Sequence, residues 1–489
     1  MKRRPTGALC VALPLLVAGC AVGPDFVRPQ PPAVDRYTYE AGPKETVAAD
    51  GRTQAFEPGA QVAADWWRLF KSPRLDGVVA EGIASNPTLQ AAQASLRRSQ
   101  DSLRAGYGVF FPQADGGFGA TRQRYTPIRI GDEAASASIF NLFTLSATVT
   151  YALDVFGGQR RAVEGLRADA DAQRYTTLAT YLTLSGNIVN AVIAWAAYRA
   201  QIQATEDLIV AEREQLQLTQ AQAEAGTVPY VNVLSLQSQL AATVATLPPL
   251  RQKLSQTDHL LATLVGRAPA EWTVPVVDLT DLTLPPDLPL SVPSELVRQR
   301  PDILTAEAQL HSSSAAIGVA TAALFPSFVL TATGGLNNTS TTDLFKLGPS
   351  GFWTLGANVT SPLFHGGTLW FQRKAAIAAY EQSLATYRQT VLAGLAQVAD
   401  ALRGLEHDAQ AVEAQSEAMT AAAEALRLIQ VNYEAGTANY LQVLIADAQY
   451  HQARLGYLQA VAQRLQDTVG LFVALGGGWW NDPTITRAP

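Results

Sequence analysis

The chain carries one motif of eleven residues twice. EAGTVPYVNVL occupies 224–234, and EAGTANYLQVL occupies 434–444, 210 positions later. Three further pairs recur in the same order at nearly the same offset: NPTLQAAQASL (86–96) with RPDILTAEAQL (300–310), FFP (110–112) with LFP (324–326), and VFGG (155–158) with LFHGG (363–367). Ordered self-similarity of this kind indicates a repeated architecture. The fold is therefore predicted to be internally duplicated.

Each half contains a proline-free segment of unusual length, 159–225 in the first half and 368–435 in the second. Apolar side chains recur at every seventh position along both segments, which predicts coiled-coil helices. A helix of about 67 residues would be about 100 Å long, far beyond the core of a globular domain. A shorter helical segment follows each long one, and Pro248 and Pro249 are expected to kink the first of these.

The first twenty residues have the features of a bacterial export signal. Basic residues at 2–4 precede a short apolar run at 8–20, which is too short to span a bilayer. The run ends in Val-Ala-Gly-Cys and resembles a lipobox, so we predict a signal peptide over 1–19 and acylation of Cys20. An ordinary signal with a coincidental cysteine is the alternative. Cys10 would be removed with the signal, which leaves no disulfide in the mature chain.

Two pairs of strand-like segments lie between the helical regions: 114–125 with 142–155 in the first half, and 327–337 with 352–361 in the second. In 142–155, apolar residues such as Val149 alternate with polar residues such as Thr148, which predicts one apolar and one wet face. A half-buried soluble sheet would also explain this alternation. The export signal and the length of the strands favour a transmembrane β-barrel.

Four strands cannot close a barrel, because backbone polar groups on an open edge cannot face lipid. The barrel must then be shared between copies of the chain. Eight strands from two copies would be packed nearly solid, whereas twelve strands from three copies leave room for a channel. Oligomerisation therefore follows from the strand count.

Composition and motifs argue against several classes of protein. The chain has 36 basic and 42 acidic residues, a net charge of −6 and no basic run, so no nucleic-acid partner is expected. After the N-terminus we find no stretch with the roughly 18–20 apolar residues of a spanning helix. The histidines lack the spacing of a zinc site, and we find no nucleotide-binding or hydrolase motif. We expect no enzyme, no metal, and no cofactor beyond a covalent lipid on Cys20.

Four stretches together resemble one known family: CAVGPDFVRP (20–29), DWWRLFKSPRLDGVVAEGIASNPTLQ (65–90), VPSELVRQRPDILTAEAQL (292–310) and NYEAGTANYLQVL (432–444). The likeness is to the lipoprotein branch of the TolC-like outer membrane factors, the NodT-type components of tripartite, RND-type efflux systems. It implies a mainly α fold with a membrane β-barrel part. Three copies would share a 12-stranded β-barrel, with four strands from each, continued by a coiled-coil α-helical barrel in the periplasm.

The resemblance also implies a function and partners. The homotrimer would be an outer-membrane exit duct for small molecules or drugs, working with a periplasmic adaptor protein and an inner-membrane pump. One alternative is the outer-membrane duct of type I protein secretion. Another is a lipid-anchored coiled-coil spacer that conducts nothing. The predicted domains are a lipid-anchored extended arm (20–64), a first repeat (65–267), a Pro-rich equatorial linker (268–299), a second repeat (300–476) and a C-terminal tail (477–489).

In such a duct the two EAGT segments would be helix-to-helix turns at the periplasmic tip. Gly226 and Gly436 suit the left-handed residue that ends a helix, and Thr227 and Thr437 suit the start of the next one. We expect these four residues to mark the hairpin tip where partners dock. The alternative is that they serve hairpin geometry alone.

Related ducts are closed by a leucine in a Y-L-x-x-L stretch, followed by charged residues. Here Tyr440 and Leu441 match the start of that stretch, but Ile445 stands where many relatives carry an aspartate, and Asp447 lies two positions on. The candidates for the periplasmic gate are therefore Tyr440, Leu441 and Asp447. Leu441 could instead be a core residue, because it begins a heptad row, and Asp447 could be a solvated helix position.

Overall fold

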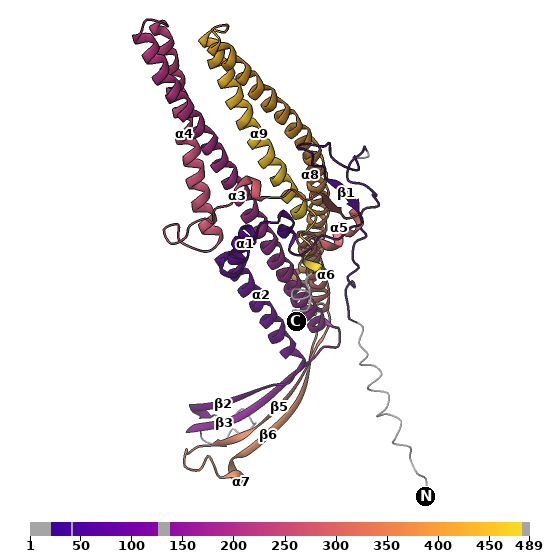
Figure 1. The fold of residues 1–489 in the computed structure, drawn as a ribbon. Helices are drawn as coiled ribbons and strands as arrows, with labels where there is room; N and C mark the ends of the chain where they lie inside the picture. Colours follow the sequence, from indigo (N-terminus) through magenta and orange to yellow (C-terminus); the bar gives the residue numbers. More distant parts are fainter. Residues whose placement is uncertain (1–20, 41–42, 126–136, 482–489) are drawn as a thin grey trace. The chain divides into compact units, whose positions relative to one another are not determined.

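A computed structural model describes residues 21–40, 43–125 and 137–481 (Figure 1). The predicted signal peptide, Cys20 and the last eight residues of the predicted tail lie outside the described residues. The chain divides into two compact units. The strand unit comprises Met1–Arg28, Arg97–Ala172 and Ala306–Thr386, and the helical unit comprises Pro29–Leu96, Gln173–Thr305 and Tyr387–Pro489.

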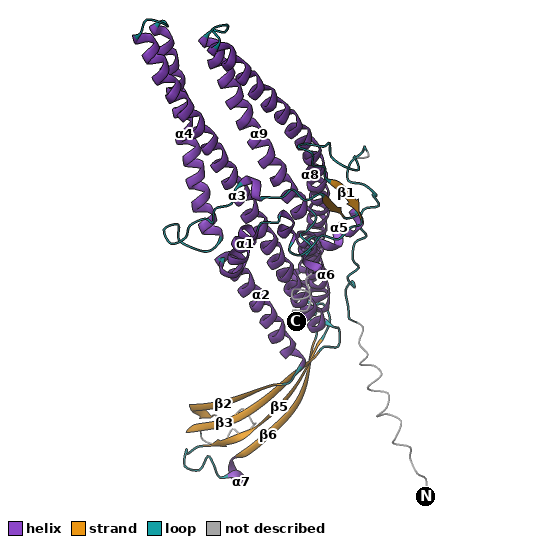
Figure 2. Cartoon of the chain, in the orientation of Figure 1, coloured by secondary structure: helices purple, strands orange, loops and turns teal. Residues whose placement is uncertain are grey.

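Both halves of the chain follow the same order of elements: two helices, two strands, a very long helix and a helix of intermediate length (Figure 2). The first half consists of α1 (Pro73–Ser85), α2 (Pro87–Gly106), β2 (Gln113–Tyr125), β3 (Ser138–Leu153), α3 (Gly158–Glu224) and α4 (Tyr230–Leu264). The second consists of α5 (Pro293–Gln299), α6 (Pro301–Ala322), β5 (Ser327–Asn338), β6 (Gly351–Thr360), α8 (Thr368–Glu434) and α9 (Tyr440–Ala474), with the short α7 (Leu347–Ser350) before β6. The predicted duplication is confirmed.

The strand unit is built around one antiparallel sheet of four strands in the order β2-β3-β5-β6. Each strand begins and ends within four residues of its predicted bounds. Strands β2 and β6 lie at the two edges, and no other described strand pairs with their outer sides. The sheet is therefore open, as the strand count predicts for a single copy.

The register aligns the apolar and polar positions across the sheet. Val149 pairs with Ala114 on one side and Ala332 on the other, and Ala332 pairs with Leu355, so this row is apolar throughout. The neighbouring row is polar: Thr148 pairs with Asp115 and Thr333, and Thr333 pairs with Thr354. The predicted alternation of Val149 and Thr148 between two unlike faces is confirmed.

Glycines form the corners where a strand passes into a long helix. Gly157 precedes α3 with φ of 78°, and Gly366 and Gly367 precede α8 with φ of 56° and 86°. These values lie in the left-handed region, which costs glycine least. The corners therefore need no ligand to explain their glycines.

The helical unit contains most of the length of four helices. Helices α3 and α8 have 67 residues each, and α4 and α9 have 35 each, as the heptad pattern predicts. Pro248 and Pro249 lie inside α4, which continues through both of them. The main core also includes the start of the first repeat, where Trp66 stacks on Phe472 of α9 at 5.4 Å between ring centroids.

Residues on either side of the first repeat are joined by a small parallel sheet. Strand β1 (Ala55–Pro58) lies in the predicted arm and pairs with β4 (Asp287–Leu290) in the predicted linker. The arm and the linker therefore carry regular structure where composition predicted an extended arm and a linker.

Among the residues that the structure describes, one helix, α3, could cross a membrane by length and composition alone. A window of 18 residues in α3 reaches a mean hydropathy of 1.3, which corrects our expectation that no such stretch follows the N-terminus. More than half of that window, 56%, is buried inside the protein. Its apolar character is explained by packing in a helical core.

Candidate functional site

The turn between α3 and α4 closes the first long helix. Gly226 has φ of 72°, and its N–H donates to the carbonyl oxygen of Ala223 (3.0 Å), while the Thr227 N–H donates to that of Gln222 (2.9 Å). This pair of hydrogen bonds is a Schellman motif, which satisfies carbonyls that a helix end leaves free. Nothing lies within 4 Å of the position that a Cβ would take on Gly226. Backbone conformation, not crowding, therefore explains the glycine.

The turn between α8 and α9 repeats this geometry. Gly436 has φ of 74°, and its N–H donates to Tyr433 O (2.9 Å), while the Thr437 N–H donates to Asn432 O (2.8 Å). The left-handed conformation predicted for both glycines is confirmed. The two EAGT motifs are thus two copies of one helix-ending device.

The threonines of these turns do not start the next helices, so that prediction was wrong. The side-chain hydroxyls of Thr227 and Thr437 donate to the carbonyl oxygen five residues earlier, at 2.8 and 3.0 Å. The residues that precede the next helices are Pro229 and Asn439. Each turn is two residues longer than we assumed, and the threonine therefore belongs to the end of the helix before it.

The helices that follow the turns begin differently. At α9, Asn439 Oδ1 accepts from the Gln442 N–H and Gln442 Oε1 accepts from the Asn439 N–H, both at 3.0 Å, which forms a capping box. At α4, Pro229 has no side chain that could accept such a bond. Only the second turn therefore leads into a helix with a side-chain cap.

Tyr440 is buried between the two hairpins of the helical unit. Its side chain is only 5% exposed, and its ring centroid lies 5.7 Å from that of Tyr433. Burial raises the pKa of its hydroxyl above the ordinary value. The surrounding apolar cluster, here called the tip cluster, draws on α3, α4, α8 and α9 and consists of Leu216, Leu236, Ile429, Tyr433, Tyr440, Val443 and Leu444. The two hairpins therefore share a core close to their turns.

Leu441 points away from this cluster. Its side chain is 62% exposed, and Ile445, one helical turn later, is 50% exposed. Residues four apart lie on the same side of a helix. The single chain therefore presents an apolar pair on the first turns of α9, and the alternative that Leu441 packs in the core of its own chain is excluded.

Asp447 lies on a different side of α9 and is partly buried. Burial raises its pKa to about 6. Burial also raises the pKa of Glu212 on α3, with a further contribution from the charge of Asp447. Thr243 of α4 donates to Glu212 Oε1 at 3.0 Å, while Glu212 Oε2 is buried without a hydrogen-bond partner. Asp447 is thus part of a pair of carboxyl groups between helices, not a solvated position.

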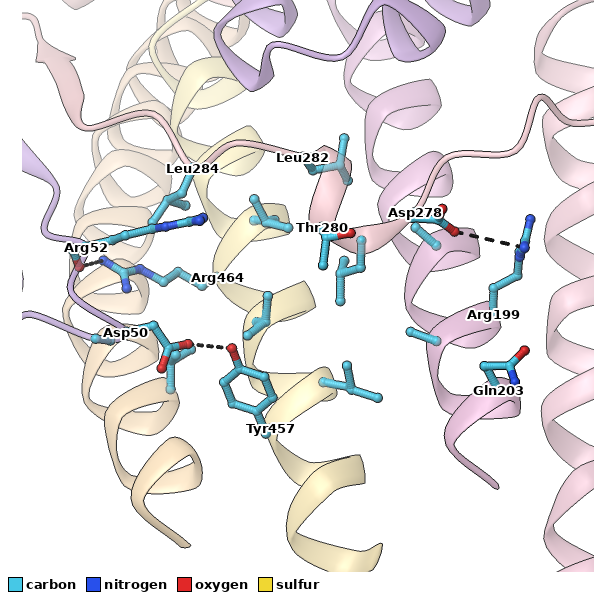
Figure 3. Close-up of a pocket in the computed structure, with 18 residues that line it drawn as sticks. Asp50, Arg52, Arg199, Gln203, Asp278, Thr280, Leu282, Leu284, Tyr457 and Arg464 are labelled. Carbon is cyan, nitrogen blue, oxygen red and sulfur yellow. Dashed lines mark hydrogen bonds and ion pairs between the residues drawn. The ribbon is translucent and has the colours of Figure 1, made fainter. Parts of the chain in front are cut away.

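The predicted arm is attached to α8 and α9 by charged and polar side chains that sequence analysis did not single out (Figure 3). Arg464, buried on α9, donates to Gln54 Oε1 and to Thr46 Oγ1, both at 3.0 Å. The Asp50 carboxylate accepts from Ser416 (2.6 Å) and Tyr457 (2.5 Å). These residues lie in polar segments without a recognisable motif, so the sequence held no signal for them.

A cavity of about 440 Å³ lies beside this attachment, within the helical unit. Figure 3 shows Asp50 directed toward Tyr457 and, at the other side of the drawn residues, Asp278 directed toward its neighbour Arg199. Next to Arg464, Asp408 has its pKa raised to about 7 by burial and by the neighbouring carboxyl of Asp467. The middle of the helical unit therefore contains a second pair of carboxyl groups that compete for a proton.

Within the described part of the chain, no three His, Cys, Asp or Glu side chains are placed to hold a metal ion. The features above are structural and mechanical: an open sheet with one apolar row, and long helical hairpins that end in glycine turns. These features are those of a subunit of an outer-membrane channel.

The sequence profile of the family described as "Outer membrane efflux protein" matches residues 78–267 and 292–477. The chain belongs to this family. The double match agrees with the duplication seen in the fold. Members of the family are channel proteins rather than enzymes. They are homotrimers in the outer membrane that work with periplasmic adaptors and inner-membrane pumps, and this chain is the outer-membrane channel of such an efflux system.

Individual relatives agree with this assignment. The pyoverdine export outer membrane protein OpmQ of Pseudomonas aeruginosa is 29% identical over 442 residues, covering 89% of this chain and 92% of the relative. The toluene efflux pump outer membrane protein TtgF of Pseudomonas putida is 28% identical over 484 residues, covering 97% and 98%. The solved structure of the outer-membrane channel OprN has a TM-score of 0.84 and 26% identity, and covers 94% of this chain and 100% of that one.

Proposed function

We propose that this channel exports small organic molecules, and that the turns of the helical unit form both its docking end and its gate. Pyoverdine and toluene, named for two relatives, are both small organic molecules. A protein-secretion duct remains the alternative cargo class. A non-conducting spacer would leave the apolar row of the open sheet without a purpose, because such a protein needs no membrane strands.

Exposed apolar side chains on the first turns of α9 carry the gate proposal. Leu441 and Ile445 lie one turn apart with at least half of each side chain exposed. Burying such a side chain contributes about 1.5–3 kcal/mol, so exposure in the single chain favours association with the same side chains of other copies. Three copies meeting at the duct axis would give an apolar plug. Ile445 makes this plug apolar where an aspartate would make it charged.

Asp447 has a different proposed role, because it does not share the side of Leu441. Its carboxyl lies near Glu212 of α3, between the two hairpins, and its pKa is raised by burial. We assign it to a latch that holds the α8–α9 hairpin against α3. Tyr440 is assigned to the same latch, because it is buried among residues from all four helices.

The first turn is the proposed docking surface for the periplasmic adaptor. Tyr230 and Val231 at the start of α4 are 65% and 61% exposed, and Leu234 is 50% exposed. Exposed aromatic and aliphatic side chains grouped on one surface are typical of protein interfaces. The glycine turns at 226 and 436 would present these residues to a partner.

The remaining proposal is the anchor. The export signal ends in a lipobox, so we assign acylation to Cys20. A closed barrel with an apolar outer band holds its place in a bilayer without a lipid, so the acyl group would assist targeting and assembly rather than retention.

The test of the gate is the single-channel conductance of purified trimers in planar bilayers. The double variant Leu441→Ala with Ile445→Ala should raise conductance well above the wild-type value. The plug would then lose most of its side-chain volume, because both side chains are shortened in each of the three copies of the chain. Val431→Ala is the matched control, since Val431 of α8 is also half exposed near the turn but has no assigned role in the gate.

An unchanged conductance in a correctly assembled double variant would remove Leu441 and Ile445 from the gate. Equal increases in the double variant and in Val431→Ala would point to general loosening of the tip. A wild-type trimer without any conductance or liposome swelling, with and without its adaptor, would support the spacer instead.

A further inference from the structure

One motif has no role in the tip, in the gate or in the sheet. Gly-Pro-Asp-Phe, residues 23–26, begins three positions after the predicted acylation site and belongs to the strand unit. Residues 21–28 form no helix or strand. Their contacts are nevertheless specific, and they involve side chains of α3 and α6.

Two close backbone approaches seat this segment. A Cβ on Gly23 would lie 2.5 Å from the Cα of Gly318 in α6, and a Cβ on Gly157 would lie 2.6 Å from the Cα of Ala21. Both glycines have φ in the left-handed region. The Val22 N–H also donates to the carbonyl oxygen of Phe156 at 3.0 Å. Ala21 is therefore in contact with the corner between β3 and α3.

Charged groups hold the middle of the segment. Arg161 of α3, whose side chain is 6% exposed, contacts Asp25 at 2.6 Å and Glu164 at 2.7 Å, and also donates to Val22 O at 3.3 Å. At the end of the segment, Arg28 contacts Glu307 of α6 at 2.7 Å. Arg161 is nearly buried and is held by Glu164, while Asp25 reaches it with a side chain that is 91% exposed. The charge-assisted hydrogen bonds of Arg161 therefore attach an exposed segment to a buried side chain.

An aromatic stack completes the attachment. The Phe26 ring lies on the His311 ring of α6 with a centroid distance of 4.3 Å and an interplanar angle of 13°. His311 Nε2 lies 2.9 Å from Glu164 Oε1, so a hydrogen bond to Glu164 fixes the orientation of the histidine ring. Burial opposes ionisation of Glu164, but hydrogen bonds from Arg161 and His311 outweigh it and lower the pKa of that carboxyl.

A groove of about 490 Å³ opens beside the seated end of the segment, within the strand unit. Its lining comes from the ends of β3, α6, β5 and β6 and from the starts of α3 and α8. Most of its large side chains are apolar, such as Leu153, Phe325 and Phe328, but Gln159 and His365 also line it. The polar atoms of Asp154 in its lining already accept from the backbone N–H groups of 159 and 160. Gln159 Oε1 is buried without a hydrogen-bond partner, so the groove offers a surface that is apolar apart from Gln159 and His365.

We propose that an acyl chain on Cys20 occupies this groove, and that residues 21–28 are a docked tether that delivers it there. The described chain begins at Ala21, which contacts the corner beside the groove, so an acyl chain on the preceding residue would need to reach only a short distance to enter it. The lipid would then pack on the ends of the membrane strands rather than hang from a free arm. The inference rests on the proposed acylation of Cys20.

Photo-cross-linking of the full chain tests this site. Cells are supplied with a diazirine-bearing palmitate analogue, trimers are purified from outer membranes, and the mass of the N-terminal peptide establishes whether the analogue is attached. After irradiation, cross-links are mapped by mass spectrometry. We expect them at groove residues such as Leu153 and Phe328.

Three variants test the expected result, and one of them is the matched control. Ala323→Trp fills the groove from the end of α6 and should reduce cross-linking to Leu153 and Phe328 about fivefold, which corresponds to roughly 1 kcal/mol on the partition between groove and bilayer. Ala316→Trp lies on the same helix, is exposed and does not line the groove, so it should leave the pattern unchanged. Asp25→Asn loosens the tether at an exposed carboxylate and should weaken the same cross-links without removing the lipid.

Three results overturn the inference. Cross-links only to bulk lipid, or to protein residues away from the groove, would place the acyl chain elsewhere. A pattern that Ala323→Trp leaves unchanged would do the same. An N-terminal peptide without lipid would remove both the acylation and the groove occupant, while the conductance of the same sample would still report separately on the channel.

Discussion

The two hairpin turns share one sequence motif, but the tyrosine that starts the next helix is exposed at the first turn and buried at the second. Tyr230 and Tyr440 occupy the same position of the repeated stretch, yet Tyr230 is 65% exposed and Tyr440 is 5% exposed. The helix that begins at Tyr230 has no side-chain cap, whereas the one that begins at Tyr440 starts with a capping box. The two repeats therefore share the turn, while the helix starts differ in exposure and capping, in keeping with the docking role proposed for the first and the gate proposed for the second.

The carboxyl pair of Glu212 and Asp447 is a second difference between the two repeats. Asp447 is aligned with Gln237 of the first repeat, and Glu212 is aligned with Ala422 of the second. Neither acidic residue of the pair therefore has an acidic residue at the aligned position of the other repeat. The carboxyl pair, to which we assigned the proposed latch, therefore joins α3 with α9 and has no symmetric counterpart.

The largest expected effect is the difference in local stability between two single variants, Tyr440→Ala and Tyr230→Ala. Tyr440→Ala should lower the local stability of the tip by about 3–5 kcal/mol, the usual cost of removing a large buried aromatic side chain. Tyr230→Ala should change it by less than about 0.5 kcal/mol, because surface substitutions rarely do more.

Hydrogen exchange of the α8–α9 backbone amides in assembled trimers measures this difference. Tyr440→Ala should speed exchange around the turn at 436 by orders of magnitude, and Tyr230→Ala should not. Similar exchange in the two variants would mean that a neighbouring copy buries Tyr230 as well. That outcome would show that Tyr230 and Tyr440 do not differ in burial in the assembled trimer.

Much of the fold could be predicted because its signals are periodic or repeated. The heptad rows predicted helices of 67 residues, and alternation at Thr148 and Val149 predicted the two faces of the sheet. The left-handed glycines followed from the requirement that a long helix must end. These features depend on local sequence alone, and each of the patterns occurs in both repeats.

Roles set by long-range contacts could not be predicted. Thr227 and Thr437 suited a helix start by residue type, but two extra residues in each turn left them at the end of the previous helix. Tyr440 and Leu441 are adjacent in sequence, and only the packing of four helices decides that one is buried and the other exposed. Arg161, the partner of Asp25, lies 136 positions away, so no local sequence pattern predicts the contact.

A second prediction concerns pH. The pKa of Asp447 is raised from 3.8 to about 6 by burial, so the folded arrangement favours the protonated form. The resulting stabilisation is fully present below about pH 4 and is lost as pH rises through about 6. Because a tenfold change in proton affinity corresponds to about 1.4 kcal/mol, this stabilisation amounts to at most about 3 kcal/mol. Contacts between α3 and α9 should therefore be stronger at pH 5 than at pH 8.

Asp447→Asn tests this sign, because an amide imitates the neutral carboxyl. Hydrogen exchange at α9 should depend on pH between about 4 and 7 in the wild type, after correction for intrinsic exchange, and should lose most of that dependence in the variant. Gln237→Asn, at the aligned position of the first repeat, is the matched control and should keep the wild-type dependence. A pH dependence that survives in Asp447→Asn would assign it to Glu212 or to the carboxyl pair at Asp408.

The smallest expected effect concerns the helix caps. Asn439→Ala removes the capping box at α9 and should lower the local stability of its first turn by about 1 kcal/mol, with a range of roughly 0.5–2. Pro229→Ala removes no side-chain hydrogen bond at α4 and should cost less, since its only loss is the fixed φ of proline. Exchange rates of the amides at 441–443 and 231–233 report on the two helix starts. If the two variants weaken their helices equally, the capping box contributes nothing beyond the backbone turn, and the closed character of the second tip must come from Tyr440 and its neighbours alone.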